Sequence, residues 1–510
     1  MGTVAAALAA LLAVPALAAP PAYSTAAPPA YSTAAPPAHS TAAPPAYSTA
    51  EAGNPFVDGR YADPDVAIYN DRYWVFPTSS RSYAEQTYLD AFSSADLVSW
   101  TKHPNVLTTA NVSWAKEAVW APAPIQRNGR YYLYFAANDI QSAAELGGIG
   151  VAVADRPEGP YVDAIGRPLI DRFFNGAQPI DQDVFIDDDG QAYIYYGGHG
   201  HANVARLNSD MTSLGTFPDG TVHKEITPAG YVEGPQMLKR NGTYYLMWSE
   251  GGWTGPDYSV AYAMSDSPIG PFRRLDKILA QDAAVARGAG HNAVLNIPGS
   301  DTWYTFYHRR PLGETDGNAR FLAYDRMQFN ADGTIQRIKM LVKDNFDDNN
   351  GVGWKTYGGS WTATGGQYRA QHSYGGKSLL TDNHTNAVYD ADVTVTSTGG
   401  DAGLVFRATS PAVGTDSYRG YYAGISPAGQ VVLGKADNNW TRLGAASLSI
   451  TPGTRYHLRV EAVGSSLKVF VDDLANPRIT VTDGTYAAGA SGVRVYNAAA
   501  DFDNVAITNR

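Results

Sequence analysis

One short pattern recurs five times along the chain and constrains its fold more than any other feature. Each copy is a turn residue, an alternating aromatic stretch and then small or polar residues, as in DRYWVFPTSS, GRYYLYFAAN, GQAYIYYGGHG, GTYYLMWSEGG and DTWYTFYHRR. Successive copies lie 58, 62, 51 and 59 residues apart, counted between Tyr73, Tyr131, Tyr193, Tyr244 and Trp303. Units of this length with little helical periodicity predict a five-bladed β-propeller with about four strands per blade.

A second pattern occupies residues 344–510. Short alternating stretches are separated by turn residues every 8–12 residues or so, which predicts a β-sandwich of the jelly-roll type. Its aromatic side chains could stack on sugars, although most aromatic residues in sandwiches belong to the core. The aromatic candidates are Trp354, Tyr357, Trp361 and Trp440. We therefore expect an all-β chain, with a catalytic propeller over residues 52–343 and a candidate carbohydrate-binding sandwich over residues 344–510.

The N-terminal residues predict export from the cell. Residues 1–18 are apolar and end in a small-x-small pattern, as in a secretory signal peptide. A membrane anchor is the alternative, but the run is rich in alanine and stops at Pro20. Four copies of the octad AAPPAYST follow, with His39 in place of Tyr in the third. This composition is typical of an extended linker over residues 19–51. We expect a secreted, extracellular protein that does not span a membrane.

Charge and cysteine content exclude several classes of function. The formal net charge is −11, and no block of basic residues offers a surface for phosphate, so nucleic acid is not an expected partner. Because the chain has no cysteine, neither disulfide bonds nor thiolate chemistry is available. Aromatic residues make up 12% of the chain against 17% charged residues, which suits sheets and sugar-stacking surfaces. We expect a monomer with a carbohydrate partner.

Carboxylates precede the aromatic stretch in three of the five units. They are Asp63 and Asp65 in the first unit, Asp181 and Asp183 in the third, and Glu233 in the fourth. Because the innermost strands of a propeller surround its axis, these carboxylates are expected to meet at one mouth. Each alone also has a structural interpretation, since Asp beside Pro favours a turn at the start of a strand.

The other two units have different residues at that place, Trp120 in the second and His291 in the fifth. His291 alone would fit a structural histidine as well, whereas Trp120 and Trp253 could stack on apolar faces of sugars. Converging carboxylates suit glycoside hydrolysis, in which one protonated acid protonates the leaving oxygen and one ionised carboxylate activates water or attacks the anomeric carbon. A third carboxylate nearby would raise the pKa of the donor.

The same residues carry a resemblance to glycoside hydrolase family 43 over roughly residues 54–340. The matching motifs are ADPD at Ala62, WAP at Trp120, PID and FIDDDGQAYIYYGG from Pro179, VEGP at Val232 and GHNAV at Gly290. The resemblance implies a five-bladed propeller and an inverting enzyme that acts on polysaccharides containing arabinose or xylose. The sandwich is similar to the concanavalin-like domains often appended to such enzymes.

The resemblance also implies roles for individual residues. Asp63 would be the general base, Asp181 the residue that orients the acid and modulates its pKa, and Glu233 the general acid. His291 corresponds to a histidine at the propeller axis, beside which a structural calcium ion binds through water. Calcium prefers oxygen ligands, and the sequence has no dense carboxylate loop there. No cofactor is required for the reaction.

One arginine of the motif YHRRP, Arg309 or Arg310, would lie near the acids and bind substrate. The loop SEGGWTGPDY after Ser249 would close one end of the site, which favours an exo enzyme. We expect release of L-arabinofuranose from arabinoxylan or arabinan of plant cell walls. The alternatives are a β-xylosidase or a dual enzyme, an exo-galactanase, an endo-arabinanase and a non-catalytic sugar-binding propeller. A retaining fructan hydrolase is disfavoured because the NDPNG and Glu-Cys motifs of that class are missing.

Overall fold

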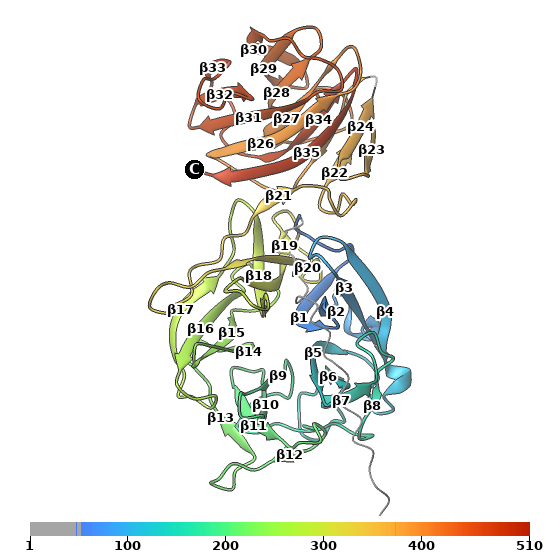
Figure 1. The fold of residues 1–510 in the computed structure, drawn as a ribbon, viewed down its shortest axis with the longest axis vertical. Coiled ribbons are helices and arrows are strands. Elements are labelled where there is room, and N and C mark those ends of the chain that lie inside the picture. The colour runs from blue at the N-terminus through green and yellow to red at the C-terminus, as the bar shows by residue number, and fades with distance from the viewer. Residues whose placement is uncertain (1–46, 48–52, 373) are drawn as a thin grey trace, which may run out of the picture. The chain divides into compact units, whose positions relative to one another are not determined.

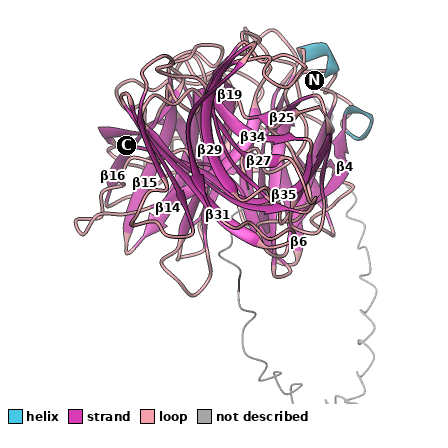
Figure 2. Ribbon diagram, turned by 90° about the horizontal axis from the view of Figure 1, so that it is seen from above, coloured by secondary structure: helices cyan, strands magenta, loops and turns pink. Residues whose placement is uncertain are grey.

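The computed structural model describes residue 47, residues 53–372 and residues 374–510. The expected signal peptide and, apart from Tyr47, the expected linker lie outside the described residues. The described residues form 35 strands and two short 3-10 helices, η1 (Tyr83–Glu85) and η2 (Thr109–Asn111). None of the helices in this part of the chain is long and apolar enough to cross a membrane. The all-β prediction is confirmed, and strands dominate the view in Figure 2.

Five antiparallel sheets, one for each sequence repeat, form a five-bladed β-propeller (Figure 1). Blade 1 contains β1 (Tyr61–Tyr69), β2 (Arg72–Ser79), β3 (Tyr88–Ser94) and β4 (Trp100–Thr108). Blade 2 contains β5 (Trp120–Arg127), β6 (Arg130–Ala137), β7 (Gly148–Ala154) and β8 (Val162–Asp163). Blade 3 contains β9 (Asp183–Ile186), β10 (Ala192–Tyr196), β11 (Asn203–Leu207), β12 (Leu214–Gly215) and β13 (His223–Glu225).

The last two blades complete the ring. Blade 4 contains β14 (Glu233–Arg240), β15 (Thr243–Glu250), β16 (Ser259–Ser265) and β17 (Arg273–Leu279). Blade 5 contains β18 (Ala286–Asn296), β19 (Trp303–Pro311) and β20 (Phe321–Met327). The strands of each blade follow one another in chain order, except that β12 and β13 both pair with β11. The aromatic residues that revealed the repeat all lie at the start of the second strand of a blade.

Apolar clusters fill the interfaces between neighbouring blades. Phe76 of blade 1 and Phe135 of blade 2 belong to one cluster, and Tyr195 of blade 3 and Trp248 of blade 4 belong to another. All four side chains are fully buried. Burying a side chain of this size stabilises a fold by about 1.5–3 kcal/mol. The alternating aromatic pattern therefore positions the blades, because one face of each sheet packs against the next blade.

Asn54 joins the two ends of the ring. Its side-chain amide donates to the carbonyl of Tyr324 at 3.0 Å and accepts from the backbone N–H of the same residue at 3.0 Å. In addition, the backbone N–H of Tyr61 in blade 1 donates to the carbonyl of Arg320, just before β20, at 3.0 Å. The first and last blades are thus held together by backbone groups as well as by apolar packing.

Two further sheets form the C-terminal β-sandwich. The eight-stranded sheet contains β21 (Val342–Asp344), β23 (Ser360–Ala363), β24 (Tyr368–His372), β26 (Ala387–Val395), β31 (Arg455–Val463), β32 (Ser466–Val471), β33 (Ile479–Thr482) and β35 (Ala498–Asn509). The seven-stranded sheet contains β22 (Lys355–Tyr357), β25 (Gly376–Leu379), β27 (Asp401–Thr409), β28 (Arg419–Ser426), β29 (Gln430–Asp437), β30 (Trp440–Ser447) and β34 (Ala490–Tyr496). The aromatic residues considered as a sugar platform are all partly buried against apolar clusters, Trp354 and Trp361 on one and Tyr357 and Trp440 on another.

Candidate active site

The innermost strands of the propeller share one backbone irregularity. The pairing register shifts after Ala62 in β1, after Trp120 in β5, after Glu233 in β14 and after Gly290 in β18. At or next to these places, and just before β9, one residue per blade has a positive φ: Asp63 (46°), Ala121 (43°), Asp181 (55°), Gly234 (62°) and His291 (47°). A β-bulge bends its strand and changes the direction of a side chain. The bulges in four blades, and the positive φ of Asp181 before β9 in blade 3, therefore turn one functional side chain of each blade into a common space.

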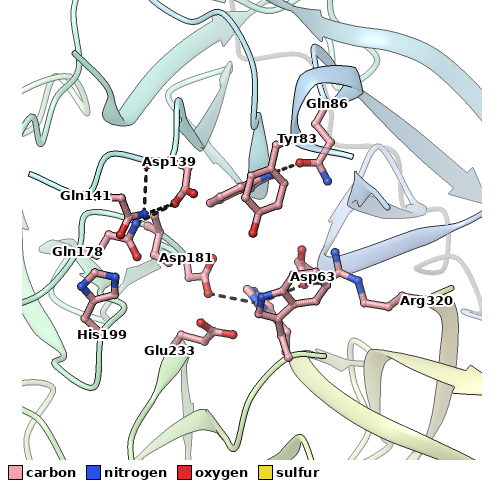
Figure 3. Close-up of a pocket in the computed structure, with 14 residues that line it drawn as sticks. Asp63, Tyr83, Gln86, Asp139, Gln141, Gln178, Asp181, His199, Glu233 and Arg320 are labelled. Atoms are coloured by element: carbon pink, nitrogen blue, oxygen red, sulfur yellow. Dashed lines mark hydrogen bonds and ion pairs between the residues drawn. The ribbon is translucent and has the colours of Figure 1, made fainter. Parts of the chain in front are cut away.

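That space is a cavity of about 260 Å³ (Figure 3). Most of the residues singled out in the sequence line it, namely Asp63, Trp120, Asp181, Glu233, Trp253 and His291. Other lining residues were not found from the sequence, among them Tyr83, Gln86, Asp139, Gln178, His199 and Arg320. The five inner strands thus bring together side chains that are far apart in the chain, as the repeat predicted.

Asp63 is surrounded by groups that favour its ionised form. Its Oδ1 lies 3.0 Å from Nη1 of Arg320 and 3.6 Å from Nδ1 of His291. His308, fully buried beneath it, accepts a hydrogen bond at Nδ1 from the backbone N–H of Asp63 at 3.2 Å. Burial alone would raise the pKa of Asp63, but Arg320 and the two histidines lower this pKa below its usual range. Asp63 is therefore a carboxylate that can accept a proton.

Glu233 has the opposite character. Burial and the charge of Asp63 raise the pKa of Glu233, and a hydrogen bond of 2.8 Å from the hydroxyl of Tyr258 lowers it in part, so that the pKa of Glu233 is about 7. The ring of Tyr258 lies against Gly290, where an added Cβ would come within 2.3 Å of the ring. The glycine of the GHNAV motif thus makes room for the tyrosine that contacts Glu233. A glutamic acid with this pKa can carry a proton near neutral pH and donate it.

Asp181 is a third carboxyl group that lines the cavity (Figure 3). Its Oδ2 lies 3.6 Å from Nδ1 of His291, the same nitrogen that faces Asp63. Burial, and then the charges of Glu233 and Asp63, raise the pKa of Asp181 well above its usual value. Because Asp181 and Glu233 each disfavour the ionisation of the other, the pair retains a proton to higher pH than a lone carboxyl group would.

Asp65 and Asp183 do not line the cavity. Oδ1 of Asp65 accepts from the backbone N–H of Val66 at 2.6 Å, and Oδ2 of Asp183 accepts from that of Met237 at 2.6 Å. Burial raises the pKa of Asp183 to about 7, and burial together with the charge of Asp183 raises that of Asp65 well above its usual value. These two carboxyl groups belong to the interior of the propeller.

The interpretation of Arg309 or Arg310 as the arginine near the acids is wrong, because neither lines the cavity. Arg309 donates to the carbonyl of Asn54 at 3.2 Å. Arg310 donates to the carbonyl of Thr254 at 2.7 Å and also to that of Gly255. Both side chains therefore hold backbone segments in place. Arg320, directly before β20, occupies the position beside Asp63, and no sequence motif marked it.

The two tryptophans lie in different surroundings. Nε1 of Trp120 donates to the side-chain oxygen of Gln86, and its ring meets that of Tyr83 edge-on, with centroids 4.8 Å apart. The guanidinium of Arg320 lies 4.8 Å from the ring centroid of Trp253. Trp253 therefore shields the arginine that pairs with Asp63. Both indole rings provide apolar surface at the cavity, of the kind on which sugar rings stack.

The residues around His291 do not fit direct calcium ligation. Within the described parts of the chain, no group of three or more His, Asp or Glu side chains is arranged to hold a metal ion. His291 presents a nitrogen to two carboxylates at 3.6 Å, whereas calcium prefers six to eight oxygen ligands at about 2.3–2.6 Å. Glycoside hydrolysis by carboxyl groups needs no cofactor.

Comparison with known proteins decides the family. Residues 52–335 match the family described as "Glycosyl hydrolases family 43". This chain belongs to that family. Residues 342–508 match the family described as "3-keto-alpha-glucoside-1,2-lyase-like domain", which corresponds to the sandwich. The resemblance noted in the sequence is thereby confirmed, and the protein is a glycoside hydrolase of family 43 with a concanavalin-like sandwich.

Its relatives within family 43 have several activities in their names. A β-D-galactofuranosidase of Aspergillus niger is 44% identical over 307 residues, which cover 58% of this chain and 86% of the relative. An arabinoxylan arabinofuranohydrolase of Bacillus subtilis is 30% identical over 347 residues, 56% of this chain and 64% of the relative. Among solved structures, an α-L-arabinofuranosidase of Clostridium thermocellum is 31% identical with a TM-score of 0.46, over 54% of this chain and 93% of that one.

Proposed function

We propose that this family 43 enzyme is an inverting, exo-acting α-L-arabinofuranosidase that removes single L-arabinofuranose units from arabinoxylan or arabinan. The observation that carries the proposal is the contrast within one cavity between Asp63, whose pKa is lowered, and Glu233, whose pKa is raised to about 7. Hydrolysis of a glycosidic bond requires one carboxylate and one carboxylic acid at the same time. The cavity supplies both at neutral pH.

In the proposed reaction, Asp63 accepts a proton from a water molecule as the water oxygen attacks the anomeric carbon. Glu233 donates its proton to the glycosidic oxygen, so that the bond to the leaving alcohol breaks. Burial and the charge of Asp63 raise the pKa of Glu233. Asp181 and Glu233 interact so that the pair retains a proton, and Arg320 keeps Asp63 ionised. At the end Asp63 is protonated and Glu233 ionised, and exchange of protons with solvent restores the starting state.

Exo action is supported by the loop that follows β15, which forms one side of the cavity. Trp253 lies in the loop that follows β15, and Arg310 fixes this loop through the carbonyls of Thr254 and Gly255. A fixed loop beside the catalytic carboxylates favours binding of a chain end or side branch over the middle of a long chain. The relative of Bacillus subtilis, an arabinoxylan arabinofuranohydrolase by name, is consistent with this substrate.

The first test is the sugar released from purified arabinoxylan, resolved by chromatography, with Asp63→Ala as the inactive control. Free arabinose and an intact xylan backbone would support the proposal, whereas xylose alone would indicate a β-xylosidase, the activity named for other relatives. Proton NMR of the sugar first released would give its anomeric configuration, and hence whether hydrolysis inverts or retains that configuration. Release of the same anomer as in the substrate would contradict inversion.

A second candidate is hydrolysis of β-D-galactofuranosides. It is favoured by the relative of Aspergillus niger, which carries that activity in its name and is 44% identical to this chain. In their rings α-L-arabinofuranose and β-D-galactofuranose have the same configuration, so one pair of carboxyl groups serves both. Release of galactose from a galactofuranose-containing polysaccharide would establish this candidate.

Secretion, a polysaccharide partner and a monomeric state remain predictions. Residues 1–18 support secretion by their signal-like sequence, and enzyme activity confined to the cell interior of the native host would contradict it. Calcium held through water near His291 also remains a prediction. Addition of a chelator should then lower the melting temperature of the protein, and an unchanged temperature would rule the ion out.

A further inference from the structure

One wall of the cavity has no part in the proposed hydrolysis. It is formed by Asp139, Gln141, Gln178 and His199, here called the polar wall. Asp139 and Gln141 follow β6, Gln178 precedes β9, and His199 lies between β10 and β11. In Figure 3 the polar wall lies on one side of the cavity and Arg320 on the other, with Asp181 and Glu233 between them.

Asp139 is the fixed centre of the polar wall. Its Oδ1 accepts hydrogen bonds from the side-chain amides of Gln178 and Gln141, both at 2.9 Å. Gln178 is only 4% exposed and donates as well to the carbonyl of Ile140 at 3.0 Å. The backbone of Asp139 has a positive φ of 44°, an uncommon conformation outside glycine that surrounding contacts must hold in place. The carboxylate is thus positioned before any ligand binds.

The other oxygen of Asp139 is left for a ligand. Within the described part of the chain, Oδ2 of Asp139 receives no hydrogen bond and its carboxylate forms no ion pair with Lys or Arg. Its two partners are neutral amides. A carboxylate in this state is a strong acceptor for hydroxyl groups, and charge-assisted hydrogen bonds are about twice as strong as neutral ones. Exposed His199 adds a second polar group beside it.

The chemistry of furanose rings indicates which hydroxyl groups would reach this wall. Asp63 and Glu233 act at the anomeric carbon, so the side arm on the far side of the ring extends away from both. This arm is a hydroxymethyl group in arabinofuranose and a dihydroxyethyl group in galactofuranose. Only the longer arm presents two adjacent hydroxyl groups to a single carboxylate.

We infer that the polar wall binds the exocyclic diol of a galactofuranosyl group, with Asp139 as the acceptor, and thereby sets the preference between galactofuranosides and arabinofuranosides. This inference rests on the proposed function, because it assigns a specificity residue to the same site. A purely structural Asp139, which only joins two loops, would affect both substrates equally.

The test compares kcat/KM for p-nitrophenyl β-D-galactofuranoside and p-nitrophenyl α-L-arabinofuranoside. For Asp139→Ala we expect the ratio of the two values, galactofuranoside over arabinofuranoside, to fall on the order of 10- to 100-fold, the effect of losing one charge-assisted hydrogen bond. Asp210→Ala is the matched control. Asp210 also caps a loop, accepting from the backbone N–H of Thr212 at 2.9 Å, but does not line the cavity, so its ratio should be unchanged.

Each outcome decides the question. An unchanged ratio in a folded Asp139→Ala variant overturns the inference, as does a wild-type enzyme that cleaves the arabinofuranoside and leaves the galactofuranoside intact. A wild-type enzyme inert on both substrates contradicts the proposed function itself. If Asp139→Ala fails to fold, Asp139→Asn retains an acceptor for both glutamines, and the same ratio measured on it decides.

Discussion

Arg407 of the sandwich and Asp181 of the propeller are both buried, but their polar surroundings differ. In the sandwich, Arg407 is 1% exposed, and its guanidinium donates to the carbonyls of Thr385, Gly464 and Tyr486. In the propeller, the buried carboxylate of Asp181 faces other carboxylates and a histidine across an open cavity.

This difference separates stability from function. A buried charge is costly unless hydrogen bonds satisfy it, and the backbone carbonyls around Arg407 do so. The carboxyl groups of the propeller are left close to one another, so their pKa values move apart instead. Substitution of Arg407 should therefore destabilise the sandwich, whereas substitution of a carboxyl group of the cavity should abolish activity.

The largest expected effect is on catalysis. Replacement of Asp63 by Asn removes the proton acceptor and should lower kcat by about 10²–10⁴-fold, measured on p-nitrophenyl α-L-arabinofuranoside. Asp65→Asn is the control, because a raised pKa already keeps Asp65 close to the neutral form that Asn imitates. Equal losses in both variants would contradict the separate roles given to these two residues.

The next effect concerns the sandwich alone. Arg407→Met would leave three buried carbonyls without a donor and should lower the free energy of unfolding of the sandwich by about 2–4 kcal/mol. Denaturant titration followed by intrinsic fluorescence measures this change, and Arg442→Met, at an exposed position, should change it little. If Arg407→Met lowers kcat while the sandwich remains stable, Arg407 does not act through stability alone, and the separation of a stabilising role in the sandwich from catalysis in the propeller is wrong.

A smaller effect is expected on the pH profile. Because Glu233 must be protonated and has a pKa of about 7, kcat/KM should fall as the pH rises through about 7. Asp63, with its lowered pKa, should keep the enzyme active well into the acid range. In Tyr258→Phe the hydrogen bond that lowers the pKa of Glu233 is lost, so the alkaline limb should move to higher pH. If the alkaline limb of the Tyr258→Phe profile stays in place or moves to lower pH, the pKa of Glu233 does not determine this limb.

The smallest effect lies on the surface of the sandwich. Hydrogen bonds to Asp390 and Asp392 raise the pKa of His457, against the opposing effect of burial. Protonated His457 therefore stabilises the fold fully below its unfolded pKa of about 6.5 and loses this contribution as pH rises through the folded value. His457→Gln should flatten the dependence of unfolding free energy on pH by less than about 1 kcal/mol. A steeper dependence of the unfolding free energy on pH in His457→Gln would contradict its assignment to the protonation of His457.

Much of the propeller could be predicted because its determinants are local in the sequence. The aromatic alternation of each unit reflects packing between blades, and the inner-strand position of Asp63, Asp181 and Glu233 follows from their place before that pattern. Arg320 could not be found this way, because its contact with Asp63 joins residues 257 positions apart. Arg309 and Arg310 had the right residue type, but their side chains bind backbone carbonyls.

The polar wall was missed for another reason. Asp139, Gln141 and His199 lie in connections between strands, where no periodicity indicates the direction of a side chain. Their arrangement depends on hydrogen bonds among the connections themselves, such as that from Gln178 to Asp139. Repeats reveal the rigid elements of such a protein, whereas its specificity is determined by segments that differ from one blade to the next.

The repeated bulges of the inner strands have a consequence for how such an enzyme can change over generations. The register shifts in four of the inner strands, and the positive-φ residue just before β9, each present one side chain to the cavity while the strand pairing that follows is regular, so these five positions can be exchanged while the scaffold is kept. Two of these five positions hold a side chain without a carboxyl group, namely Trp120 in blade 2 and His291 in blade 5. A single substitution at one of these positions therefore changes a side chain that faces the sugar and leaves the propeller fold unchanged.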